Sequence, residues 1–128
     1  MMKTRIISFC LLFVAMVSLV GCTEKPELII NEAALVGKWQ ATDRTTEFWR
    51  YNADGTGQTW DEADDVHEDD TVGVLHFSWT TVQSHLELDY YGEMGQHAYE
   101  NYTVTHQTQD SLVWKDLYGD YRTFVKIQ

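Results

Sequence analysis

Short runs of alternating apolar and polar residues, separated by turn-forming residues, fill the chain from Leu35 to its end. The clearest run is 86–90, in which two leucines and a tyrosine fall on one face and two acids on the other, as in a half-buried strand. The same pattern predicts further strands at residues 37–43, 46–51, 57–62, 72–80, 98–106, 111–117 and 121–127. We expect no helix in this region.

The links between these runs are short and rich in turn residues. Asp54-Gly55 lies between two β-rich runs and predicts a hairpin, because both residues tolerate positive φ. Residues 80–85 and 92–95 are predicted to be the turns on either side of strand 86–90. Short links imply antiparallel neighbours, and closing the meander removes both free sheet edges. We therefore predict an all-β fold, an antiparallel up-and-down meander of about eight short strands that closes into a small barrel.

The N-terminal residues predict an export signal. Lys3 and Arg5 precede the apolar run Ile6–Val20, which is short for a membrane span but fits a signal peptide. Leu19-Val20-Gly21-Cys22 then resembles the bacterial lipobox, in which the cysteine is acylated and the peptide is cut before it. We interpret residues 1–21 as a lipoprotein signal peptide, with Cys22 as the lipid attachment site. The alternative is an ordinary secretory signal with a chance cysteine.

The predicted cleavage changes the composition of the mature chain. Residues 22–34 are then the lipidated cysteine and a tether, and residues 35–128 are the barrel domain, although the apolar Leu28–Ile30 could dock on that domain instead. The mature chain retains all 20 acidic residues and 7 of the 9 basic ones, so its net charge is −13. Nucleic acid is not an expected partner, and with no free thiol, thiol catalysis and disulfides are excluded. We expect an extracytoplasmic protein anchored to a bacterial membrane, the outer membrane of a Gram-negative cell.

The strand segments also resemble a known family. Gly37-Lys38-Trp39 is similar to the Gly-x-Trp start of the first strand of lipocalins, and the order of later motifs, such as Phe77-Ser78-Trp79, resembles small lipocalin-like (calycin-type) domains of bacterial lipoproteins. The resemblance implies that Trp39 closes one end of the barrel under a basic residue of the last strand, either Arg122 or Lys126. The chain is shorter than classical lipocalins and lacks their C-terminal helix, which argues against a cavity for a retinol-sized ligand.

Aromatic residues, 13% of the chain, are the strongest candidates for a binding function. The side chains predicted to face the barrel interior and contact a ligand are Trp60, Phe77, Trp79, Leu88, Tyr90, Tyr102 and Trp114. We expect a small apolar or amphipathic molecule there, with an acidic rim that disfavours anions. The alternatives are a solid barrel that binds glycans or proteins through outward Trp49 and Tyr51, and a purely structural protein.

No pattern in the sequence predicts catalysis, a cofactor or a metal centre. Seven carboxylates fall within residues 61–70, but their spacing does not match a calcium loop, and a solvated acidic loop is the simpler interpretation. The five histidines do not have the spacing of a zinc site. No nucleophile elbow or phosphate-binding loop occurs. We therefore expect a binding protein that is not an enzyme.

Overall fold

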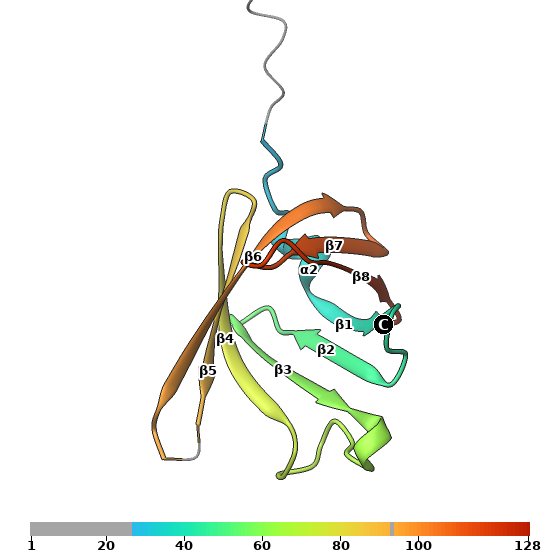
Figure 1. The fold of residues 1–128 in the computed structure, drawn as a ribbon, viewed down its shortest axis with the longest axis vertical. Helices are drawn as coiled ribbons and strands as arrows, with labels where there is room; N and C mark the ends of the chain where they lie inside the picture. Colours follow the sequence, from blue (N-terminus) through green and yellow to red (C-terminus); the bar gives the residue numbers. More distant parts are fainter. Residues whose placement is uncertain (1–26, 93) are drawn as a thin grey trace, which may run out of the picture.

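The computed structural model describes residues 27–92 and 94–128, and they form a β-barrel (Figure 1). Its strands are β1 (Gly37–Ala41), β2 (Glu47–Tyr51), β3 (Thr56–Asp61), β4 (Leu75–Val82), β5 (His85–Tyr91), β6 (His97–Gln107), β7 (Ser111–Lys115) and β8 (Tyr121–Lys126). A single-turn helix, α2 (Glu32–Leu35), precedes β1, and a 3₁₀ turn, η1 (Glu62–Asp64), follows β3. No helix in these described ranges is long and apolar enough to cross a membrane. The predicted signal peptide and Cys22 lie outside the described residues.

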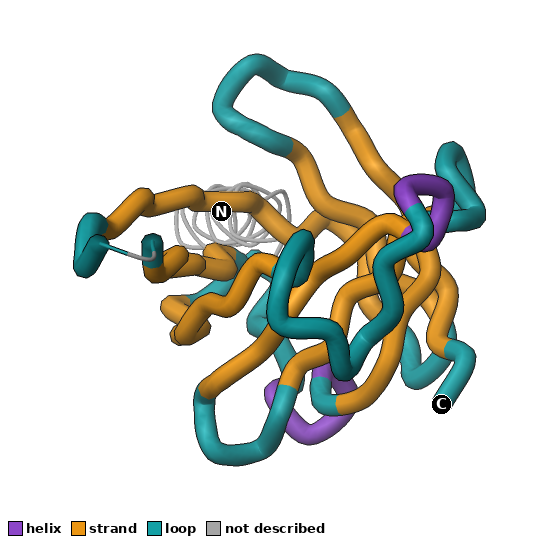
Figure 2. Tube along the Cα trace, turned by 90° about the horizontal axis from the view of Figure 1, so that it is seen from below, coloured by secondary structure: helices purple, strands orange, loops and turns teal. Residues whose placement is uncertain are grey.

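Each strand pairs antiparallel with the next in sequence, and β1 pairs with β8 to close the sheet. The predicted fold class, an all-β meander of eight strands closed into a barrel, is thereby confirmed, and it is compatible with a calycin-like fold. The β5–β6 ladder runs from His85↔Thr103 to Tyr91↔His97. Because β6 pairs with β7 only from Thr103 onward, this hairpin projects from the rest of the barrel (Figures 1 and 2).

The predicted strand ends differ from the observed ones around β4. The prediction placed a turn at residues 80–85, but β4 continues to Val82, and only Gln83 and Ser84 form the turn, with Gln83 in the left-handed region at φ 57°. Thr80 and Thr81 suggested a turn because they are polar, yet they pair with β5 and extend the ladder. Helix α2 was also not expected. It begins where the Asn31 side chain accepts a hydrogen bond from the Ala34 amide.

Alternation along the strands gives the barrel one apolar interior. The residues of its core include Trp39, Trp49, Tyr51, Phe77, Trp79, Leu86, Leu88, Val104, Leu112, Trp114 and Phe124. Gly57 also faces inward, and a Cβ there would lie 2.4 Å from the Phe77 ring, so only glycine lets this ring pack against β3. The middle of the barrel is therefore filled with large side chains rather than hollow.

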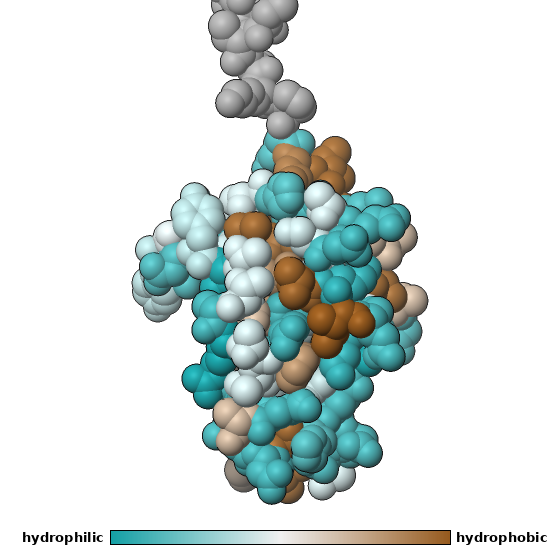
Figure 3. Space-filling view, turned by 90° about the vertical axis from the view of Figure 1, so that its right-hand side faces the viewer, coloured by the Kyte–Doolittle hydropathy of each residue, from teal (hydrophilic) through white to brown (hydrophobic). Residues whose placement is uncertain are grey.

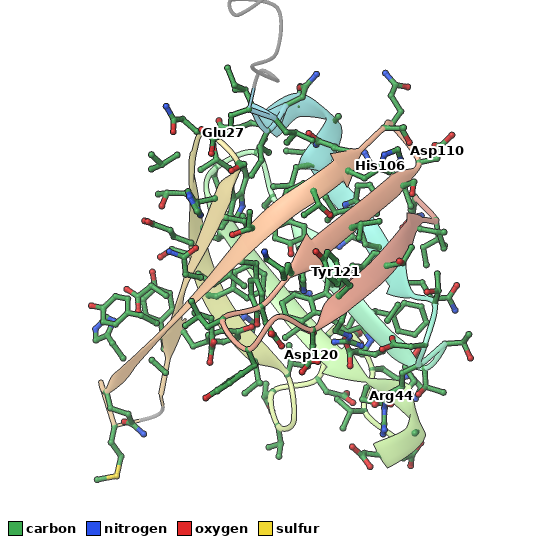
Figure 4. The ribbon with its side chains drawn as sticks, turned by 45° about the horizontal axis from the view of Figure 1, so that its top comes forward. Glu27, Arg44, His106, Asp110, Asp120 and Tyr121 are labelled. Atoms are coloured by element: carbon green, nitrogen blue, oxygen red, sulfur yellow. The ribbon has the colours of Figure 1, made fainter. Side chains whose placement is uncertain are left out.

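The segment before β1 covers one end of the barrel, which we call the closed end. Ile30 is buried in the core, and its amide donates to the Gln83 carbonyl in the β4–β5 turn. Leu28 packs against the same core while Ile29 is exposed, so this segment docks on the barrel instead of hanging free. Figure 3 shows apolar residues beside the point where the described chain begins. Glu27 and Asp110 lie at this end, and Arg44 and Asp120 at the opposite end (Figure 4).

The closed end is sealed by Trp39 and Lys126. The Trp39 indole donates to the Leu35 carbonyl at 2.8 Å, and the Lys126 ammonium lies 5.0 Å from the Trp39 ring centroid. The same ammonium donates to the carbonyls of Ala34 and Val36, at 2.6 and 2.9 Å. Of the two basic residues that the sequence offered as the partner of Trp39, Lys126 takes this place.

Candidate functional site

The opposite end of the barrel, which we call the mouth, holds a pocket of about 370 Å³. Its lining residues include Glu47, Trp49, Trp60, Asp61, Asp64, Leu75, Tyr90, Tyr102 and Arg122. They come from both sides of the barrel, since β2 and β8 begin at this end and β3 and β5 finish there. No segment of the described chain covers this pocket in the way that α2 covers the closed end.

Stacked aromatic rings form the floor of the mouth. Tyr102 stacks on Trp114 with ring centroids 4.3 Å apart and planes 18° apart. Trp49 meets Trp114 edge to face at 5.2 Å, and Trp114 in turn packs against Phe124 at 4.3 Å. Of these rings only Trp49 and Tyr102 line the pocket, and Trp114 and Phe124 support them from the core below.

Arg122 provides the central charge of the mouth. Its guanidinium donates to Glu47 at 2.8 Å and to both carboxylate oxygens of Asp43, at 2.9 and 3.2 Å. The same Glu47 oxygen accepts the Trp49 indole N–H at 2.7 Å. Burial disfavours the charge of Arg122, but the hydrogen bonds to Asp43 and Glu47 outweigh burial and raise the pKa of Arg122. The prediction of Arg122 as a barrel-closing residue is wrong, because it pairs with Trp114 in the ladder four residues before Lys126 and so lies at the mouth.

The tyrosines of the mouth are held in their neutral form. Burial raises the pKa of Tyr102 to about 12, and burial together with the neighbouring Tyr102 raises the pKa of Tyr90 further. Burial also raises the pKa of Tyr51, whose hydroxyl has no hydrogen-bond partner in the described chain. Neutral phenols both donate and accept, so Tyr90 and Tyr102 can orient a ligand that carries either kind of group.

The structure brings six of the seven predicted interior residues to the inner side of the barrel. Phe77, Trp79, Leu88 and Trp114 belong to the core, and Tyr90 and Tyr102 are partly buried against it. Only Tyr90 and Tyr102 of these six also line the mouth pocket; the others fill the barrel below it or beside it.

Trp60 is the exception: its ring lies on the outer face of the barrel, although the residue also lines the mouth pocket as predicted for a ligand contact. It pairs with Phe48 across β2 and β3, one position out of phase with the inward pair Trp49↔Thr59. On this outer face its ring stacks on Phe48 at 5.6 Å, and the Lys38 ammonium lies 5.3 Å from its centroid. The sequence interpretation chose the largest side chain of the strand as inward. Gly57 and Thr59 face the barrel interior, so the alternation of the strand turns Trp60 outward.

The outward platform of Trp49 and Tyr51 is also wrong. Both side chains are buried, with exposed fractions of 5% and 1%. The two apolar faces of β2 are accommodated separately: the inner face joins the core, while Phe48 on the outer face is covered by Lys38 and Trp60. A glycan or protein partner therefore cannot reach Trp49 or Tyr51 on the outer surface.

Glu47, Asp61 and Leu75 line the pocket but were not among the predicted site residues. Glu47 offered a signal, because the period of two puts this carboxylate on the same face as Trp49 and Tyr51. Asp61 pairs with Arg44, and the Ala63 amide and the Thr46 hydroxyl also keep the pKa of Asp61 below its ordinary value. Leu75 offered a similar signal, because within the predicted strand 72–80 the period of two puts it on the same face as Phe77 and Trp79.

The acidic stretch forms the β3–β4 connection at the rim of the mouth. Glu68 accepts two hydrogen bonds from Arg50, at 2.7 and 3.3 Å, and its carbonyl accepts from Gln58, so the connection is held on the outer face of β2 and β3. Within residues 27–92 and 94–128, no group of three histidine, cysteine or acidic residues is placed to hold a metal ion. Asp54 accepts from the amide and the hydroxyl of Thr56, as a hairpin turn requires.

Comparisons with known proteins found no relative for this chain: no family model, no curated protein and no solved structure matches it. The fold and the mouth therefore have to be interpreted from their own geometry.

Proposed function

We propose that this chain is a lipid-anchored, extracytoplasmic binding protein of lipocalin-like type that holds a small amphipathic molecule at the mouth of its barrel. The observation that carries the proposal is the pocket of about 370 Å³ at the mouth, where Trp49, Tyr90 and Tyr102 line it. This volume falls near the lower end of the range for small-molecule sites, about 300–1,000 Å³. Because the barrel below is filled, the ligand would lie at the rim rather than deep inside.

The position of the mouth suits an anchored receptor. The described chain begins at the closed end, where Glu27 bonds to Ser84 beside the β4–β5 turn. Strand β5 runs from this turn to Tyr90 in the mouth, a distance of about 20 Å for six residues of strand. An acylated Cys22, a few residues before Glu27, would leave the mouth facing away from the membrane and open to solutes.

The charges of the mouth limit the chemistry of the ligand. Arg122 is already shared by Asp43 and Glu47, and Arg44 is paired with Asp61. Asp64 adds a further carboxylate to the lining, so acidic groups outnumber basic ones around the pocket. A neutral or cationic ligand with a flat apolar part is therefore favoured, and an anionic one is repelled. No residue of the mouth is assigned a catalytic role, and the proposal is one of binding alone.

Mass spectrometry of the full chain tests both halves of the proposal. The chain is made in a Gram-negative host, extracted in detergent, and weighed in native and denatured form. We expect a denatured mass that begins at Cys22 and includes two or three acyl chains, and a native mass that is larger by a noncovalent ligand of a few hundred daltons. An unacylated chain would refute the anchor, and equal native and denatured masses would refute the carried ligand.

Two matched variants locate the ligand. Leu75 is exposed at the rim of the pocket, and Leu75→Trp is expected to fill the pocket and remove the added native mass. Val82 is exposed near the other end of the same strand, and Val82→Trp is expected to leave that mass unchanged. Loss of the ligand in both variants, or in neither, would place it outside the mouth.

A further inference from the structure

A second surface with the features of a ligand site lies on the outside of the barrel, away from the mouth. It spans the outer faces of β4, β5 and β6, where Ser78, Thr80, Glu87, Asp89 and Tyr99 line a shallow pocket of about 230 Å³. These residues fall opposite one another in the ladders, as Ser78↔Asp89, Thr80↔Glu87 and Asp89↔Tyr99. We call this set the outer shelf. Its residues on β5 and β6 belong to the hairpin that projects from the barrel (Figures 1 and 2).

Tyr99 also lines a neighbouring pocket. The second pocket also measures about 230 Å³, and Glu87 and Tyr99 line both. Its other polar walls are Glu100 and Asn101, and Leu117 from the β7–β8 turn closes its far side. Tyr99, which is 76% exposed, is thus shared by two shallow pockets of similar size.

The Tyr99 ring is held by its neighbours. It stacks on the His97 imidazole with the planes 14° apart and the centroids 6.2 Å apart. His97 is fixed in turn, because its Nδ1 lies 2.9 and 3.0 Å from the two carboxylate oxygens of Asp89. Tyr91 meets the edge of His97 at 5.5 Å. A fixed ring loses less conformational entropy when a ligand stacks on it than a free one would.

From this geometry we propose that the outer shelf binds a neutral or amino-bearing glycan chain, with consecutive sugar rings in the two pockets on either side of Tyr99. The weakly positive C–H groups of a sugar ring are attracted to the negative face of an aromatic ring. The hydroxyls of Ser78 and Thr80, the carboxylates of Glu87 and Asp89 and the amide of Asn101 can pair with sugar hydroxyls.

Charge and shape select this class of ligand. No lysine or arginine lines either pocket, whereas Glu87, Asp89 and Glu100 do, so an acidic glycan would be repelled. In both pockets polar side chains border apolar surface, and the pockets are two small hollows rather than one continuous groove, which suits separate sugar rings, with their hydroxyls and C–H faces, better than a peptide helix or a fatty chain.

The test uses the full chain in a detergent that carries no sugar headgroup, applied to a printed array of neutral, amino-bearing and acidic glycans. We expect the wild-type chain to bind neutral or amino-bearing glycans and Tyr99→Ala to lower the affinity roughly tenfold or more, because stacking is lost. Tyr99→Phe retains the ring and is expected to retain binding. Tyr118 is exposed but lines neither pocket, so Tyr118→Ala is the matched control.

Several results would overturn the proposal. These are the absence of any glycan signal for the wild-type chain, binding of acidic glycans only, and equal binding by Tyr99→Ala. Circular dichroism of each variant checks that the barrel remains folded. Asp89→Asn provides a second measurement on a different residue. It weakens the bond to the His97 imidazole that supports Tyr99 and also removes a carboxylate that lines the pocket, so glycan affinity is expected to fall without any change in the ligand mass carried at the mouth.

Discussion

The two ends of the barrel place a basic residue of β8 over an aromatic ring in different surroundings. At the closed end Lys126 lies 5.0 Å from the Trp39 ring, and at the mouth Arg122 lies 5.2 Å from the Phe124 ring. The four-residue spacing puts both cations on the inner face of the strand. Lys126 is satisfied by backbone carbonyls under a covering segment, whereas Arg122 is satisfied by two carboxylates beside an open pocket.

This difference separates stability from binding. Carbonyls held by the backbone cannot titrate or exchange partners, so the closed end is fixed once Leu35 and Ile30 are buried over it. Carboxylates and neutral phenols at the mouth can exchange hydrogen-bond partners and accept a ligand without breaking the core below them. The following predictions test whether the two ends divide their roles in this way.

The largest expected effect is at the closed end. Trp39 is fully buried, and Trp39→Ala would remove its packing and its bond to Leu35, so we expect the free energy of unfolding to fall by about 3–5 kcal/mol. Leu75→Ala at the mouth is the control. Because Leu75 is exposed, this substitution is expected to change the free energy of unfolding by less than about 0.5 kcal/mol. Urea unfolding followed by circular dichroism measures both. Equal losses would show that the mouth is as structural as the closed end.

Alkaline pH is expected to act through the interior tyrosines. Tyr51, Tyr90 and Tyr102 have a raised pKa in the folded barrel, so above about pH 10 the unfolded chain ionises first and binds fewer protons. The free energy of unfolding then falls as pH rises, by about 1.4 kcal/mol per pH unit for each such tyrosine, until the folded pKa is reached. That limit is about 12 for Tyr102.

Tyrosinate absorbance and circular dichroism, followed together against pH, measure this effect. We expect three of the seven tyrosines to ionise only as the barrel unfolds. In Tyr102→Phe the free energy of unfolding should fall less steeply as pH rises, because the contribution of one tyrosine to this slope is removed. Ionisation of all seven in a barrel that stays folded would contradict the burial of these phenols.

The sequence predicted the sheet well and the ends of the barrel less well. Alternation such as that of 86–90 and the hairpin signal at Asp54-Gly55 are local, and the strands they predict are the ones observed. Whether Trp60 points into the barrel or outward depends on the register of β3 with β2. Whether Arg122 or Lys126 lies at the closed end depends on which end of β8 contacts α2. These are relations between distant segments, which no local pattern encodes.

The candidate site was partly predictable for the same reason. Tyr90 and Tyr102 stand on clear alternating strands, so their inward direction followed from the pattern. The Glu47–Arg122 pair joins residues 75 positions apart and forms only when the barrel closes. The outer shelf was not predicted either. His97 and Tyr99 lie in a segment whose pairing with Tyr91 and Asp89 needed the turn at 92–96 to be placed correctly.

The two cations of β8 provide the sharpest contrast between the ends. Lys126→Met would leave the carbonyls of Ala34 and Val36 without this partner, and Arg122→Met would leave Glu47 and Asp43 without theirs. At neutral pH each change is expected to lower the free energy of unfolding by about 1–3 kcal/mol. The two losses should differ in how they depend on pH.

The hydrogen bonds from Arg122 hold the pKa of Asp43 below its ordinary value. The associated stability is present above the unfolded pKa, about 3.9, and is lost as pH falls through the lower folded value. The cost of Arg122→Met is therefore expected to shrink below about pH 4, whereas carbonyls do not titrate and the cost of Lys126→Met should stay constant. Urea midpoints of the wild type and both variants across this range measure the difference. Parallel curves would refute the distinction between the ends.

The smallest expected effect concerns the β3–β4 connection at the rim of the mouth. The β3–β4 connection is held by the partly exposed pair of Arg50 and Glu68, while apolar burial holds the cover of the closed end. Glu68→Gln is expected to cost only about 0.2–1 kcal/mol of global stability, since such pairs are screened by water and salt.

Hydrogen exchange should nevertheless become faster in residues 62–74 and stay unchanged in residues 27–36. Asp69→Asn removes the same charge from an exposed position in that connection and should alter neither segment. Unchanged hydrogen exchange in residues 62–74 of Glu68→Gln would contradict this expectation. It would mean that apolar contacts, such as the packing of Val66 beside Gly73, hold the rim as firmly as Leu35 and Ile30 hold the closed end.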